Sequence, residues 1–247
     1  MNKIISAGFL AYIAVTSMGM FVVALIVFLT TCLFDRRLVV LHYFSSFWAS
    51  IYLWSMPAWS ISVEGRRNIR LSGTYVVVSN HQSQLDILMA FRLFFPFKWV
   101  SKAEVFRLPF IGWNMALNRY VKLYRGDSDS ARTMMAQCEA HLREGSSVYF
   151  CPEGTRSETG WMRPFKPGAF ILAHKMKTPI LPVAINGTRH ALPKNSVDFH
   201  GRHHLRITVL PEIPYERFKD LSVEETAVMV RDTLAAHIDE HRASPRQ

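Results

Sequence analysis

The chain opens with two long apolar stretches. Residues 4–34 contain no Asp, Glu, Lys or Arg over 31 positions, and about 20 apolar residues suffice to cross a bilayer. In residues 38–63 only His42 can carry a charge near neutral pH. This second stretch also carries three tryptophans, a residue that favours the membrane–water interface: Trp48, Trp54 and Trp59. The pattern predicts two membrane helices within residues 1–63, joined by a short turn at 34–37, that either cross the bilayer or enter one leaflet.

Beyond residue 64, β-rich segments alternate with segments of helical period. The expected strands are residues 74–79, 98–101, 120–124, 146–151, 179–185 and 205–210. The expected helices are residues 84–95, 128–145, 167–177 and 223–241. Ser or Asp caps the second of these helices, Gly145 ends it, and Pro167 opens the third. Alternation of this kind is typical of a layered α/β domain with a largely parallel sheet. We therefore expect a membrane-anchoring segment, residues 1–63, followed by one α/β domain, residues 64–247.

The net charge of +10 lies mainly in the middle of the chain. Residues 64–219 carry 23 Lys and Arg against 12 Asp and Glu, which gives +11, whereas residues 220–247 carry three against six, which gives −3. Beside a membrane segment, such an excess favours anionic headgroups or a phosphorylated substrate, and no nucleic-acid-binding motif accompanies it. Basic residues at 36–37 favour a cytoplasmic turn, and those at 66–70 favour a cytoplasmic α/β domain; a helix pair embedded from the cytoplasmic side satisfies both.

The stretch "NHQSQLD", residues 80–86, places a histidine directly after an expected strand and before an expected helix. In such a turn Asp86 can fold back onto His81, where a carboxylate fixes the imidazole tautomer and stabilises the protonated ring. The motif supplies no nucleophile, because Ser83 is better placed to cap the helix. The residues alone leave two interpretations: a base that activates a substrate hydroxyl, or a polar turn.

The stretch "YFCPEGTRS", residues 149–157, follows another expected strand. The guanidinium of Arg156 matches phosphate oxygens, and the turn at Gly154, with Thr155, adds further hydrogen-bond donors. The alternative is a salt bridge between Glu153 and Arg156 around a turn. Two isolated basic residues at strand ends are weaker candidates: Lys102 and Arg125.

These motifs together resemble the 1-acyl-sn-glycerol-3-phosphate acyltransferase family of glycerolipid acyltransferases. The family's NHxxxxD block matches residues 80–86, and its second block matches "VKLYRG" with Arg125, although Tyr124 departs from the usual residue. "PEGTRS" is intact at 152–157 and is followed by "FKPG", and "PILPVAI" matches the fourth block. The resemblance covers roughly residues 64–215 and includes the spacing of Lys102, Glu104, Pro109 and Gly112.

The resemblance implies an enzyme that transfers an acyl chain from acyl-CoA or acyl carrier protein to the sn-2 hydroxyl of lysophosphatidic acid. It implies His81 as general base, Asp86 as its orienting carboxylate and Lys102 as a candidate for oxyanion stabilisation. The candidates for substrate binding are Arg125, Glu153, Gly154, Thr155 and Arg156. No metal and no cofactor are expected, and the expected partners are lysophospholipid, acyl thioester and membrane lipids. The expected location is a bacterial-type inner membrane, with the catalytic domain, residues 64–247, facing the cytoplasm.

Other interpretations of the sequence remain open. The same scaffold can acylate another lysophospholipid. Cys151 suggests an acyl-cysteine intermediate, although its place in an apolar strand favours packing. "HGRHH", residues 200–204, suggests a metal site, with a surface loop as the alternative. An inactive relative is disfavoured because the histidine and the aspartate of the first block are both present. The three cysteines, Cys32, Cys138 and Cys151, are too scattered for a disulfide framework or a zinc site and fit a reducing compartment.

Overall fold

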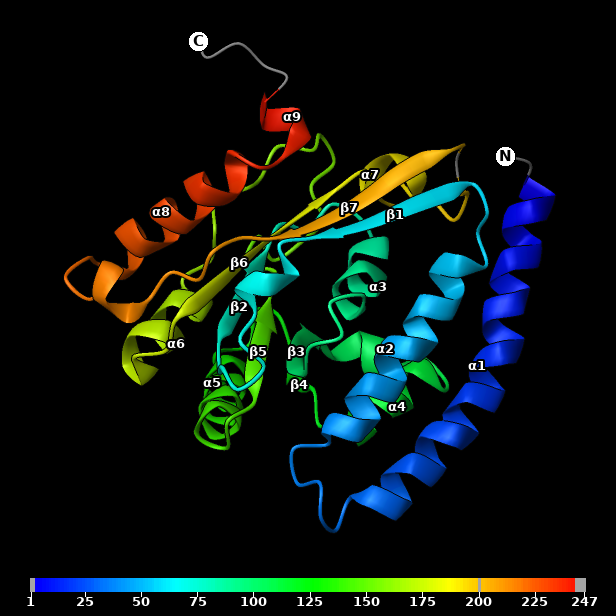
Figure 1. Cartoon of the computed structure of the whole chain (residues 1–247), viewed down its shortest axis with the longest axis horizontal. Helices are drawn as coiled ribbons and strands as arrows, with labels where there is room; N and C mark the ends of the chain where they lie inside the picture. The colour runs from blue at the N-terminus through cyan, green and yellow to red at the C-terminus, as the bar shows by residue number, and fades with distance from the viewer. Residues whose placement is uncertain (1–2, 200, 243–247) are drawn as a thin grey trace.

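A seven-stranded sheet forms the centre of the molecule in the computed structural model, which describes residues 3–199 and 201–242 (Figure 1). The strands are β1 (Trp59–Glu64), β2 (Val76–Ser79), β3 (Phe97–Lys102), β4 (Val121–Leu123), β5 (Ser147–Phe150), β6 (Ile180–Asn186) and β7 (His203–Val209). Their order across the sheet is β1-β7-β6-β2-β5-β3-β4. Every neighbouring pair is parallel except β6 and β7, so the predicted layered α/β fold with a largely parallel sheet is confirmed.

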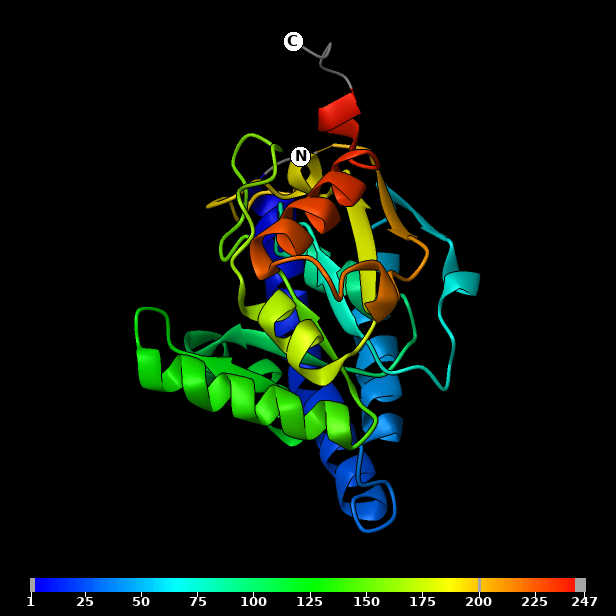
Figure 2. The ribbon, with the colours of Figure 1, turned by 90° about the vertical axis from the view of Figure 1, so that its left-hand side faces the viewer.

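Helices cover both faces of the sheet. They are α1 (Lys3–Thr31), α2 (Val39–Trp54), α3 (Leu85–Phe91), α4 (Ile111–Leu117), α5 (Ser128–Arg143), α6 (Gly168–Met176), α7 (Thr188–Ala191), α8 (Val223–Ala235) and α9 (Asp239–Arg242). Short 3-10 turns are η1 (Arg66–Asn68), η2 (Ala103–Arg107) and η3 (Tyr215–Arg217). Figure 2 shows α5, α6 and α8 in front of the sheet and α1 behind it.

The alternation of side chains along each strand divides the core into two parts. In β2, Val77 packs with α2 and α3 in one cluster, whereas Val76 and Val78 pack with α5, α6 and α8 in the other. All three valines are fully buried. Successive side chains of a strand point to opposite faces of the sheet, so a continuous apolar run such as residues 76–78 is what a strand covered on both faces requires.

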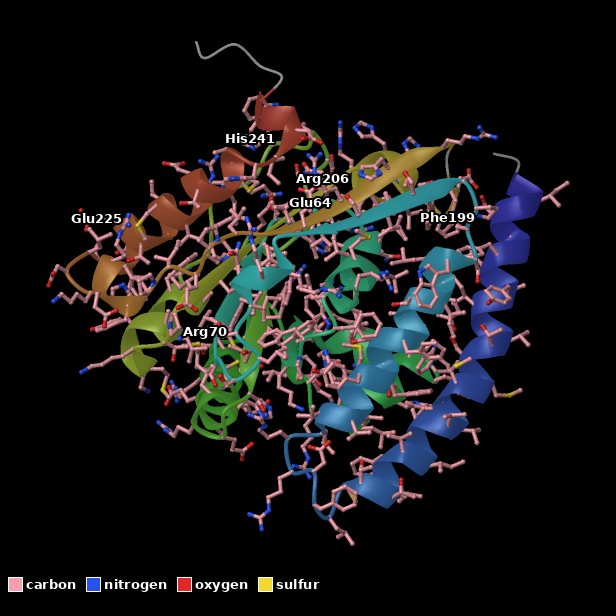
Figure 3. The ribbon with its side chains drawn as sticks, viewed as in Figure 1. Glu64, Arg70, Phe199, Arg206, Glu225 and His241 are labelled. Carbon is pink, nitrogen blue, oxygen red and sulfur yellow. The ribbon has the colours of Figure 1, made fainter. Side chains whose placement is uncertain are left out.

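The first apolar stretch forms α1, and residues 6–31 of it are long and apolar enough to cross a membrane. Large side chains along α1 are exposed, including Val15, Ile26 and Leu29. The start of α1 is attached to the domain, because the Phe199 backbone N–H donates to Ser6 Oγ at 3.0 Å and the Phe9 and Phe199 rings lie 5.0 Å apart (Figure 3).

The second apolar stretch does not form the predicted membrane helix through residue 63. Helix α2 has 16 residues, fewer than the roughly 20 needed to span a bilayer, and residues 59–64 form β1, which pairs with β7. Trp48 and Trp59 are buried inside the protein, and only Trp54 among the three tryptophans is exposed. Packing inside the protein, against the sheet and against α1, therefore explains much of this apolar run.

The termini of the later helices follow local signals. The Asp127 side chain accepts the backbone N–H groups of Asp129 and Ser130 and caps α5, and Gly145 beyond its end has φ 79°, which confirms the predicted cap and stop. Ser222 and Glu225 form a reciprocal capping box at the start of α8. The predicted closing helix, residues 223–241, is instead divided into α8 and the short α9, with the fully buried Ile238 between them.

Candidate active site

The loop after β2 is fixed to the neighbouring strand β6 by Asn80. Its side-chain amide donates to the Ile185 carbonyl at 2.8 Å, and its side-chain oxygen accepts the Ile185 backbone N–H at 2.8 Å. Asn80 is fully buried. A buried amide that is satisfied in both directions holds the backbone in one position, so the residue that follows, His81, starts from a fixed point.

His81 and Asp86 are in direct contact, as the sequence predicts. His81 Nδ1 lies 2.8 Å from Asp86 Oδ2, and the Asp86 side chain is 2% exposed. The same oxygen accepts the backbone N–H groups of Gln82 at 2.6 Å and Ser83 at 2.8 Å. Asp86 lies in the first turn of α3, so the helix start and the loop before it close around one carboxylate.

This contact sets the chemistry of the imidazole. A carboxylate on Nδ1 keeps the proton of the neutral ring on that nitrogen and leaves Nε2 with its lone pair. The His81 side chain is 19% exposed, and none of the described residues bonds to Nε2. A substrate hydroxyl at Nε2 can therefore lose its proton to a ring whose resulting positive charge Asp86 stabilises.

Glu153 joins the second motif to the first. Its Oε1 accepts the His81 backbone N–H at 2.8 Å and its Oε2 accepts the Arg163 backbone N–H at 3.0 Å. The Ser157 backbone N–H in turn donates to the His81 carbonyl at 2.8 Å. Burial raises the pKa of Glu153 above its usual value, although the two backbone donors oppose this shift. Glu153 thus accepts hydrogen bonds from two backbone N–H groups, and the alternative salt bridge between Glu153 and Arg156 is not present.

The turn after Glu153 requires a glycine. Gly154 has φ 70°, which side chains of L-residues rarely allow, and a Cβ there would lie 2.7 Å from Lys166 Cε. Thr155 and Arg156 follow and are partly exposed. No ion pair links Arg156 to another described residue, so its guanidinium is available to a ligand beside the His81 loop.

Lys102 and Arg125, like His81, lie at the carboxyl ends of strands, but on strands farther across the sheet from β2. Lys102 is the last residue of β3 and pairs with Leu123 of β4, two residues before Arg125; both basic side chains are exposed. With about 4.8 Å between neighbouring strands, β3 and β4 stand about 10 and 15 Å from β2 in the sheet order. The structure thus gathers His81, Asp86 and the 153–156 turn, and leaves Lys102 and Arg125 at the periphery.

Thr188 is a site residue that the sequence analysis missed. Its hydroxyl donates to Asp86 Oδ1 at 2.5 Å, and it is fully buried. Gly187 before it has φ 82°, and a Cβ there would collide with the His204 carbonyl. The available signal was a Gly-Thr pair directly after β6, because strands parallel to β2 end at the same edge as His81.

The structure gives little support to the two alternatives, an acyl-cysteine intermediate at Cys151 and a metal site at residues 200–204. Burial raises the pKa of the Cys151 thiol to about 12, so it is not a thiolate nucleophile at neutral pH. His204 contacts Ser60 Oγ at 2.8 Å and Ser62 Oγ at 2.9 Å through its two ring nitrogens. His200 of the same motif lies outside the described residues, and within those residues no cluster of three or more His, Cys, Asp or Glu is placed to hold a metal.

Glu153→Gln is expected to lower the thermal unfolding temperature by several degrees, because an amide can accept only one of the two backbone N–H groups. An unpaired buried donor costs about 1–3 kcal/mol, and each kcal/mol corresponds to roughly 2–4 °C at this size. The measurement is a melting curve in detergent. Glu158→Gln is the matched control, since its pair with Lys194 is on the surface, with the Glu158 side chain 69% exposed. Equal shifts in the two variants would contradict this role of Glu153.

Taken together, the fold and the site define an α/β protein with a carboxylate-oriented histidine at the carboxyl edge of a parallel sheet. A model of the Acyltransferase family matches residues 60–186, just over half of the chain. The chain belongs to the Acyltransferase family.

Several named proteins are similar to this chain. The 1-acyl-sn-glycerol-3-phosphate acyltransferase BAT2 of Brassica napus is 34% identical over 223 residues, which cover 87% of this chain and 64% of that protein. LPAT1 of Arabidopsis thaliana, with the same activity in its name, is 38% identical over 68% of this chain and 47% of its own length. The chain thus spans about half to two thirds of these relatives. The crystal structure of the 1-acyl-sn-glycerophosphate acyltransferase PlsC from Thermotoga maritima has a TM-score of 0.78 and 23% identity, with full coverage of both chains, and supports the fold.

Proposed function

We propose that this chain transfers a fatty acyl group from an acyl thioester to the free sn-2 hydroxyl of lysophosphatidic acid, giving phosphatidic acid. The observation that carries the proposal is the buried Asp86 carboxylate 2.8 Å from His81 Nδ1, with Nε2 left for a substrate. The names of the similar proteins support the acceptor. The donor is acyl-CoA or acyl carrier protein, and no cofactor or metal takes part.

In the proposed reaction His81 Nε2 removes the proton of the acceptor hydroxyl. The resulting oxygen attacks the thioester carbonyl, the tetrahedral intermediate collapses, and the thiolate leaves and takes the proton from the imidazolium. General-base assistance is typically worth about 10² to 10⁴ in rate. Lys102 is the candidate for stabilising the oxyanion. Because it lies at the end of β3, two strands away from β2, its exposed side chain must reach toward His81 to contact the thioester.

The acceptor phosphate is assigned to Arg156, with the Gly154 turn and Thr155 in support and Arg125 as a second, more distant arginine. Positioning of the acceptor by its phosphate can contribute up to roughly 7 to 11 kcal/mol in favourable cases. Because the Ser157 N–H donates to the His81 carbonyl, a phosphate held by this turn lies next to the base. Glu153 acts here through the backbone that it holds.

Arg156→Ala is expected to raise the KM for lysophosphatidic acid by about 10- to 100-fold, since a hydrogen bond to a charged group is worth about 1.5–3 kcal/mol. The KM for the acyl donor should stay near the wild-type value. Initial rates with each substrate varied in turn provide the measurement, and Arg132→Ala, an exposed arginine of α5, is the control. Equal increases in both KM values would overturn the phosphate assignment.

The apolar helix α1 supports a location in a membrane, where both the acceptor and the product reside. We place the catalytic domain on the cytoplasmic side of a bacterial-type inner membrane, because basic residues flank the first apolar segments. Membrane lipids are then the surroundings of the protein as well as the source of its acceptor.

The second candidate function is acylation of a different lysophospholipid by the same fold. The exposed Tyr124, beside Arg125, favours it, because this residue departs from the family's second block. A panel of acceptors distinguishes the two: lysophosphatidic acid, lysophosphatidylcholine, lysophosphatidylethanolamine and monoacylglycerol. The proposal expects the highest kcat/KM with lysophosphatidic acid and little turnover of monoacylglycerol, which lacks the phosphate. A higher kcat/KM with a zwitterionic lysophospholipid would mean that this lipid, and not lysophosphatidic acid, is the acceptor.

A further inference from the structure

A small basic cavity of about 140 Å³ lies where the turn between α1 and α2 meets β3, α5 and the end of α4. Three basic side chains line it, Arg36, Lys98 and Arg119, together with His141 and Glu144. Lys98 lies at the amino end of β3, whereas Lys102 and the site lie at its carboxyl end. At about 3.3 Å per residue along a strand, the cavity is more than 10 Å from the edge that carries His81 and forms a separate site.

Lys98 is buried without a carboxylate partner. The residue is 3% exposed, and its ammonium donates to the carbonyls of Arg37 at 2.8 Å and Asn118 at 2.9 Å. Burial and the nearby Arg119 lower its pKa to about 8. A buried ammonium is normally paired with an acid, so this lysine, next to other cations, favours the approach of an anion.

The two arginines of the cavity also lack a carboxylate partner among the described residues. Arg36 and Arg119 form no ion pair with any described residue, and the Arg119 guanidinium donates to the Arg36 carbonyl at 3.4 Å. Two nearby acids reduce this positive charge without cancelling it: Asp35 accepts the Val40 backbone N–H at 2.8 Å, and Glu144 is the one carboxylate among the residues that line the cavity. The cavity therefore has an excess of positive charge.

An apolar surface adjoins this charge. At the end of α1 and in the turn that follows, Leu29 is 61%, Leu33 88% and Phe34 75% exposed, immediately before Arg36. Figure 1 shows this turn at the lower end of α1. Exposed apolar side chains beside a basic cavity match a lipid, with its acyl chains on the helix and its phosphate in the cavity.

We propose that this cavity binds the phosphate group of an anionic membrane phospholipid, with Arg36, Lys98 and Arg119 as its ligands. The size of the cavity suits one phosphate group, and the adjoining apolar end of α1 distinguishes a lipid from free phosphate. The inference depends on the charge and shape of this region and is independent of the proposed acyl transfer.

Binding of dioctanoyl phosphatidylglycerol to the purified full-length protein in detergent tests the proposal, because this lipid is neither the acceptor nor the product of the proposed reaction. The variant is Arg36→Gln/Arg119→Gln, two exposed positions whose replacement should leave the melting temperature unchanged. We expect at least a tenfold loss of affinity in this variant and no change in its weak binding of dioctanoyl phosphatidylcholine.

The control is Arg217→Gln/Lys219→Gln, which removes the same charge from two exposed residues of and beside η3, a turn that packs against α6 and does not line the cavity. It should bind phosphatidylglycerol as the wild type does. Unchanged affinity in the Arg36/Arg119 variant, or an equal loss in the control, would overturn the site. Inorganic phosphate that binds as tightly as phosphatidylglycerol would overturn the lipid as its ligand.

Discussion

His81→Ala is expected to reduce acyl transfer by at least about 10² to 10⁴, the usual contribution of a general base, while the protein stays folded and membrane-bound. In the proposed mechanism the ring takes the acceptor proton, and Asp86 holds the ring through Nδ1. Removal of the imidazole leaves the turn of residues 153–157 in place, since Glu153 and Ser157 contact the backbone of residue 81 and not its side chain. The measurement is the turnover number with lysophosphatidic acid, together with KM.

The matched control is His204→Ala, an exposed histidine of β7 whose ring contacts Ser60 and Ser62. It should retain wild-type turnover. A melting temperature close to that of the wild type in His81→Ala excludes loss of fold as the cause. If folded His81→Ala turns over at a near-normal rate, the assignment of the base is wrong.

Asp86→Asn is expected to lower turnover by about 10² to 10⁴, because an amide neither stabilises the imidazolium nor fixes the required tautomer. The four groups that donate to Asp86 also make this residue structural, so turnover is compared with thermal unfolding. Thr188→Val provides the comparison, as it removes the bond to Oδ1 and leaves His81 on Oδ2.

The two variants separate catalysis from packing. Thr188→Val should lose stability with only a modest loss of turnover, whereas Asp86→Asn should lose far more turnover than its unfolding temperature explains. An equal loss of turnover in the two variants would mean that Asp86 acts through packing alone.

Much of the sheet could be predicted because local signals and long-range packing agree. A continuous apolar run such as residues 76–78 is what a strand buried on both faces requires, and Asp127 and Gly145 mark the ends of α5. The bounds of the second predicted helix were wrong, since residues 59–64 form β1, because burial inside a protein selects the same residues as lipid does. Trp48 and Trp59 show this, since Trp48 is buried against α1 and Trp59 is buried in the core beneath the sheet.

The contact between His81 and Asp86 was predictable because the two residues share one turn. The roles of Thr188 and Glu153 were not, because they depend on which strand ends lie side by side. β2 lies between β5 and β6, which brings Glu153 to the His81 backbone from one side and Thr188 to Asp86 from the other. Strand order is a long-range property that spacing along the chain does not encode.

Direct attack by the acceptor hydroxyl is tested by transfer of a labelled acyl group from acyl-CoA or acyl carrier protein to lysophosphatidic acid by the purified protein. We expect labelled phosphatidic acid with the new acyl chain at sn-2 and no labelled protein in quenched reactions. Absence of labelled phosphatidic acid with both donors, or a labelled acyl-enzyme formed before it, would contradict direct attack by the acceptor hydroxyl.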